Sequence, residues 1–155
     1  MIDIRRMNAE IRMLQDQFGS DRVVWPRNYR WVLVKGFRLP PGLTKAATNV
    51  VVLIPDQYGN GAPLRDAFLD PELKAYNRES RQFESMPHYF KQYPYAKLDL
   101  GSREEWARKL WQYICIHKEN GKATGAGILT YLDSVYTFLT DPFRDWTGTF
   151  DSYNK

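Results

Sequence analysis

A nearly unbroken apolar run at residues 49–54, Asn-Val-Val-Val-Leu-Ile, is the feature that most restricts the fold of this chain. A short run of this kind, bounded by turn residues, is typical of a strand buried on both faces. Residues 55–63 follow it with two prolines, two glycines, an aspartate and an asparagine, a composition that predicts a turn. We therefore expect a sheet with residues 49–54 at its centre.

Two further strands are predicted before this run. Residues 29–35 (Tyr-Arg-Trp-Val-Leu-Val-Lys) alternate bulky and β-branched side chains, and residues 22–25 indicate a shorter strand that Pro26 separates from them. Residues 36–42 are predicted to form a loop. Because no crossover helix fits between these strands, they favour an antiparallel meander. From residue 64 to 94 the periodicity fades, and we expect a long irregular segment.

Helices are predicted at both ends of the chain. Five apolar residues at spacings of three and four predict a helix over residues 3–18, which Gly19 ends; they are Ile4, Met7, Ile11, Leu14 and Phe18. A Ser-x-x-Glu capping box at residues 102–105 predicts a short helix through Leu110. The apolar face of residues 128–139 predicts a last helix, with Thr124 as its cap and Asp141-Pro142 as its end.

This order of elements predicts an α+β fold, with an N-terminal helix, an antiparallel β-meander and C-terminal helices. We expect one domain over residues 1–155, with a partly disordered tail at residues 143–155. No apolar run is long enough for a membrane span, and a single cysteine favours a reducing compartment, so we expect a cytoplasmic protein without a membrane partner.

The net charge of +4 comes from scattered basic residues, so a basic nucleic-acid-binding domain stays an alternative without a supporting motif, and no nucleic-acid partner is expected. One cysteine and two histidines without metal-ligand spacing argue against a metal site. Phosphate-loop, dinucleotide and Gly-x-Ser-x-Gly patterns are absent, and we expect no cofactor.

The only cysteine, Cys115, lies between two isoleucines in Trp-Gln-Tyr-Ile-Cys-Ile-His. One interpretation is a small buried hydrophobe. The other is a nucleophile, since on an extended segment His117 shares the face of Cys115 while Ile114 and Ile116 point inward. A turn at residues 119–121 would then place the thiol beside a polar loop. Lys118 and the helix start near Thr124 would add positive potential, which lowers the pKa of a thiol.

Several short motifs, in this order, resemble the ubiquitin-conjugating enzyme fold. They are Val50–Ile54, Pro55-Asp56-Gln57-Tyr58 with Pro63, Ile114-Cys115-Ile116, and Ile128–Leu139 followed by Asp141-Pro142. Three further motifs look like the bacterial relatives, which occur in operons resembling eukaryotic ubiquitination. These are Phe37-Arg38-Leu39-Pro40, Met86-Pro87-His88-Tyr89-Phe90 and Trp111-x-x-Ile-Cys-Ile-His.

The resemblance implies an enzyme in which Cys115 accepts a ubiquitin-like modifier as a thioester from an activating enzyme and transfers it to an amine of a target protein. Eukaryotic members have a His-Pro-Asn motif before the cysteine, and this chain has none at that spacing. His88, His117 and Asn120 are the candidates for that supporting role, and a core or turn role is the alternative for each.

By the same resemblance, the first helix would contact the activating enzyme through Arg5, Arg6 and Arg12. A deconjugating peptidase would be a further partner, and antiphage defence in bacteria the setting. The alternative is an inactive relative, a binding module that keeps the fold and holds a modifier without forming a thioester.

Overall fold

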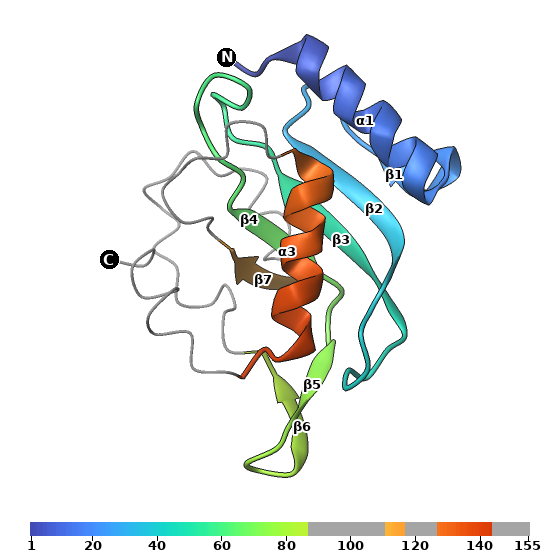
Figure 1. Cartoon of the computed structure of the whole chain (residues 1–155), viewed down its shortest axis with the longest axis vertical. Helices are drawn as coiled ribbons and strands as arrows, with labels where there is room; N and C mark the ends of the chain where they lie inside the picture. The colour runs from blue at the N-terminus through green and yellow to red at the C-terminus, as the bar shows by residue number, and fades with distance from the viewer. Residues whose placement is uncertain (87–110, 117–126, 144–155) are drawn as a thin grey trace.

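An antiparallel sheet of five strands, in the order β1-β2-β3-β4-β7, lies at the centre of the fold (Figure 1). The computed structural model describes residues 1–86, 111–116 and 127–143. Its helices are α1 (Ile4–Phe18) and α3 (Ile128–Thr140), with a 3-10 turn η1 at Ser20–Arg22. Its strands are β1 (Val23–Val24), β2 (Trp31–Arg38), β3 (Ala47–Leu53), β4 (Asp66–Leu69), β5 (Lys74–Asn77), β6 (Gln82–Ser85) and β7 (Gln112–Cys115). The predicted α+β class, N-terminal helix and antiparallel sheet are confirmed.

The apolar run forms β3, the middle strand of the five, as its composition predicted. Its neighbour β2 extends further than expected, because residues 36–38 continue the strand instead of starting the loop. The pairing register shifts between Val34 and Phe37, and Gly36 adopts a φ of +65° at this irregularity. Glycine tolerates that left-handed conformation, so β2 bulges there and resumes its pairing with β3.

Three of the described strands lie within residues 64–86, where the sequence predicted irregular structure. β4 pairs with β3, and β5 and β6 form a separate hairpin. Every residue of β4 is buried, so the alternation that identifies a half-buried strand is missing from its sequence. Residues 87–94 lie outside the described part of the chain, as does the helix predicted at residues 102–110.

Both helices contribute to the main hydrophobic core. Met7, Ile11 and Leu14 of α1 join the apolar face of α3 and one face of the sheet in a single cluster. Side chains at alternate positions along the strands point the other way and form a second cluster of buried residues: Val51, Leu53, Phe68, Tyr113 and Cys115. The sheet is therefore buried on both faces around β3, β4 and β7.

The last helix begins at Ile128, and Gly127 occupies its N-cap position. Thr124, the predicted cap, lies outside the described residues. The helix ends at Thr140, with Asp141 as its C-cap and Pro142 after it, as the sequence indicated. Neither described helix is long and apolar enough to cross a membrane.

Candidate functional site

Cys115 is the last residue of β7, which pairs only with β4 among the described strands and so forms one edge of the sheet. Ile114 and Ile116 point into the main core, as predicted, while Cys115 faces the second cluster. Its partner across the strand pair is Asp66. Directly opposite residues in an antiparallel pair carry their side chains on the same face, so the thiol and the Asp66 carboxylate are neighbours.

Tyr113 completes a polar group on this face. It lies two residues before Cys115 in the same strand, and its hydroxyl donates a hydrogen bond to Oδ1 of Asp66. Both side chains are buried, although each has a polar group. Burial raises the pKa of Tyr113 well above its usual value, and the neighbouring Asp66 and Cys115 raise it further. Tyr113 is therefore a neutral hydrogen-bond donor at ordinary pH.

Tyr131 of α3 approaches the same sheet edge from the other side. It is completely buried, and burial, followed by the charges of Asp66 and Cys115, raises the pKa of its hydroxyl well above 10. No sequence pattern pointed to Asp66, Tyr113 or Tyr131, because β4, β7 and α3 are far apart along the chain. Asp66 and Tyr113 come together only through the pairing of β4 with β7.

The thiol is less accessible than the nucleophile interpretation predicted. Cys115 is only 6% exposed and packs in the second cluster with Val51, Leu53 and Phe68. The turn predicted at residues 119–121 lies outside the described residues. Lys118, one expected source of positive potential, and Thr124, near which the other source (a helix N-terminus) was expected, lie outside the described residues.

A second polar group joins α1 to the start of α3. Glu10 is 8% exposed, and its carboxylate accepts a hydrogen bond from the Ile128 amide at 2.6 Å and from the Tyr58 hydroxyl at 2.8 Å. Arg6 pairs with the same carboxylate at 2.8 Å, and its guanidinium lies 4.8 Å from the centre of the Tyr58 ring. Burial and the charge of Glu10 raise the pKa of Tyr58. The Glu10 carboxylate thus caps the N-terminus of α3 from another helix.

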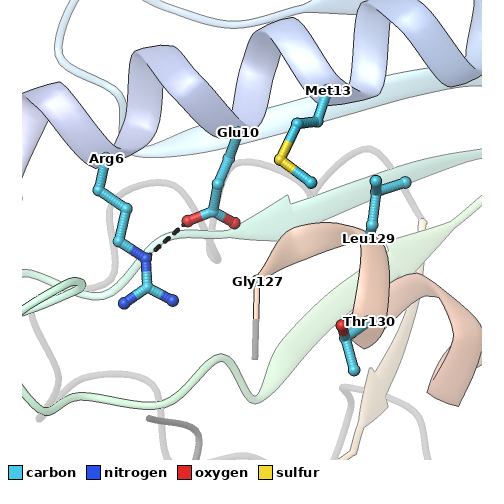
Figure 2. A pocket seen from close by; sticks show the side chains of 6 residues that line it. All are labelled: Arg6, Glu10, Met13, Gly127, Leu129 and Thr130. Atoms are coloured by element: carbon cyan, nitrogen blue, oxygen red, sulfur yellow. Dashed lines mark hydrogen bonds and ion pairs between the residues drawn. The ribbon is translucent and has the colours of Figure 1, made fainter. Parts of the chain in front are cut away.

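Figure 2 shows this junction, where Arg6, Glu10 and Met13 of α1 face Gly127, Leu129 and Thr130 across a pocket of about 310 Å³. A side chain at Gly127 would collide with the Glu10 carboxylate, so the glycine is required by the cap. Tyr58 belongs to the Pro-x-x-Tyr turn, whose tyrosine therefore holds α1 in place.

The three arginines predicted to bind a partner differ in their surroundings. Arg5 and Arg12 are exposed on α1 and are available for a partner. Arg6 is partly buried, since its side chain is 29% exposed and is held by Glu10 and Tyr58. Arg5 and Arg12 are therefore the more accessible of the three arginines.

His88, His117 and Asn120 lie outside the described residues. Among the residues that the structure describes, no group of histidine, cysteine, aspartate and glutamate side chains is arranged to hold a metal ion. The candidate site is therefore the group of Cys115, Asp66 and Tyr113, with Tyr131 behind it. Comparisons with protein-family models, curated proteins and solved structures found no match.

Proposed function

We propose that this chain is a ubiquitin-conjugating-like enzyme that carries a ubiquitin-like modifier as a thioester on Cys115. The observation that carries the proposal is the position of the only cysteine, at a sheet edge beside the buried Asp66–Tyr113 pair. The order of α1, the antiparallel strands, the Pro-x-x-Tyr turn, the cysteine and α3 supports the ubiquitin-conjugating-like fold. The partners are an activating enzyme, a modifier, a target protein and a deconjugating peptidase, in bacterial antiphage defence.

The first step is transthiolation. Sγ of Cys115 attacks the thioester carbonyl carbon of the modifier on the activating enzyme, and a new S–C bond forms on Cys115. The bond to the cysteine of the activating enzyme breaks, and that sulfur leaves with the proton that Cys115 gave up. Because Cys115 is buried, docking of the activating enzyme must uncover the thiol before this exchange.

The second step transfers the modifier to an amine. The amine nitrogen attacks the thioester carbonyl, a C–N bond forms, and the S–C bond to Cys115 breaks. The Asp66 carboxylate is the described group that can take the proton of the attacking amine. The Tyr113 hydroxyl, which donates to Asp66 in the free protein, can turn to the oxyanion of the tetrahedral intermediate once Asp66 has taken the proton, a role for which the sequence offered only His88, His117 and Asn120.

The alternative is a binding module of the same fold that holds a modifier without a covalent bond. The burial of Cys115 in an apolar cluster favours this alternative, since a thiol packed among valine, leucine and phenylalanine fills space like a small hydrophobe. The two functions make opposite predictions about a covalent adduct.

The test is to incubate the protein with its activating enzyme, modifier and ATP and to separate the products without reducing agent. The enzyme forms an adduct that dithiothreitol removes and that Cys115→Ala abolishes. Asp66→Asn and Tyr113→Phe form this adduct, but pass the modifier to free lysine about 10- to 100-fold more slowly. Asp133→Asn, an exposed carboxylate on α3, serves as the matched control and leaves both steps unchanged.

Absence of the adduct with partners that charge a second conjugating enzyme would contradict the proposal. Non-covalent binding of the modifier under the same conditions would then support the binding module.

A further inference from the structure

A second pocket, of about 550 Å³, lies where the β5–β6 hairpin meets the C-terminal end of α3. Figure 1 shows the hairpin next to this end of the helix. The pocket is lined by residues 41–42, 76–79 and 139–143. The Tyr76 amide donates to the Gly42 carbonyl at 2.8 Å, and the Thr44 amide donates to the Lys74 carbonyl at 2.9 Å. These two bonds hold β5 against residues 42–44, so two walls of the pocket are fixed relative to each other.

The pocket has a negative rim on a chain whose net charge is +4. The last turn of α3 contains no basic residue, although a helix C-terminus carries a partial negative charge that a lysine or arginine usually balances. Asp141 at the C-cap adds a full negative charge there, and Glu79 adds another from the hairpin. Neither carboxylate makes an ion pair within the described part of the chain. Among the described lining residues, Arg78 is the one basic residue.

The described lining also has apolar and aromatic members beside the polar Asn77 and Thr140. Leu139 and Pro142 are buried, and Phe143 is partly buried. The Tyr76 side chain is 42% exposed, and its ring is supported by Phe83 in an edge-to-face contact with centroids 5.4 Å apart. A ring held in this way offers its remaining surface to a cation. Apolar side chains next to carboxylates suit a side chain with a long aliphatic stem and a positive head.

We propose that this pocket binds a basic peptide segment of a partner protein, through an arginine side chain placed between Tyr76, Glu79 and Asp141. The guanidinium lies at the negative end of α3, and its stem covers Leu139 and Phe143. The complementary charge is the reason for this choice of occupant, because the lining residues that the structure describes include two carboxylates and a helix C-terminus against one arginine. None of the lining residues belongs to the group around Cys115, so the site is independent of thioester chemistry.

The probe is a fluorescein-labelled peptide with two arginines among leucine and glycine residues, and the comparison peptide has glutamates in place of the arginines. Fluorescence polarisation at 50 and 300 mM salt measures their binding to the full chain. The arginine peptide binds and weakens with salt, while the glutamate peptide does not bind. In an NMR titration, amide shifts concentrate at residues 42, 76–79 and 139–143.

Variants of the charged lining residues are expected either to weaken or to strengthen peptide binding. Glu79→Gln with Asp141→Asn keeps the shape, removes two charges and weakens arginine-peptide binding about three- to tenfold. Asp16→Asn with Asp133→Asn changes the net charge equally at exposed sites on α1 and α3, and leaves binding within about twofold. Arg78→Gln removes the opposing charge and strengthens binding, an outcome that no misfolded variant reproduces.

Three results would overturn the proposal. These are equal losses in the two charge-matched double variants, weaker binding in Arg78→Gln, and amide shifts confined to other parts of the chain.

Discussion

Replacing Glu10 by alanine tests whether a side chain of α1 caps α3. The carboxylate accepts hydrogen bonds from the Tyr58 hydroxyl and the Ile128 amide, and Tyr58 is only 1% exposed. Leaving a buried hydroxyl without its acceptor lowers the free energy of unfolding by about 1–3 kcal/mol, and loss of a helix cap lowers it by about 0.5–2 kcal/mol. The Arg6 pair adds little, because the arginine side chain is partly exposed. The free energy of unfolding should fall by about 2–4 kcal/mol.

Urea unfolding followed by circular dichroism measures this change. With a slope of about 2 kcal/mol per molar urea, the midpoint moves down by about 1–2 M. Glu10→Gln keeps an acceptor oxygen and should lose about half as much. Gln17→Ala, an exposed position on the same helix, should stay within about 0.5 kcal/mol of the unaltered protein. A loss for Glu10→Ala below about 1 kcal/mol, or one equal to that of Gln17→Ala, would refute the cap.

Gly127→Ala places a methyl group against the Glu10 carboxylate and should lower the free energy of unfolding by about 1–3 kcal/mol. In a Glu10→Ala background the same substitution should lower it much less, and a double-mutant cycle measures the difference. Three buried tyrosines have pKa values raised above 10, so the native chain keeps protons that the unfolded chain releases. The free energy of unfolding should therefore keep the full contribution of these tyrosines below about pH 10 and fall as the pH rises above it. Absorbance at 295 nm should show at least three of the ten tyrosines untitrated while the protein is folded. Native Cys115 should react with a thiol reagent about 100-fold more slowly than in 8 M urea, and equal rates would contradict its burial.

The helices and the central strand were predictable because each carries a long local pattern. The stripe of α1 repeats every three to four residues, and the run of β3 is apolar throughout. The short strands were not predictable. β5 and β6 have four residues each, too few for a period to emerge, and β4 is buried on both faces.

The candidate site depends on contacts that the local sequence does not record. The alternation Ile114-Cys115-Ile116 predicted that the thiol points away from the main core, and it does. The same alternation says nothing about whether the opposite face is covered, so the sequence left a buried and an accessible thiol open as alternatives. The Asp66–Tyr113 bond joins residues 47 positions apart, and strand register alone creates it.

The contact between Glu10 and Ile128 can form only late in the synthesis of the chain. These residues are 118 positions apart, so Glu10 leaves the ribosome long before the helix that it caps. Until α3 has been synthesised, the nascent chain has the apolar stripe of α1 and a carboxylate without one of its donors. Contacts of such long range also slow folding. The α1–α3 junction therefore closes only after synthesis has passed α3, and a chain stalled before Ile128 leaves α1 without its cover.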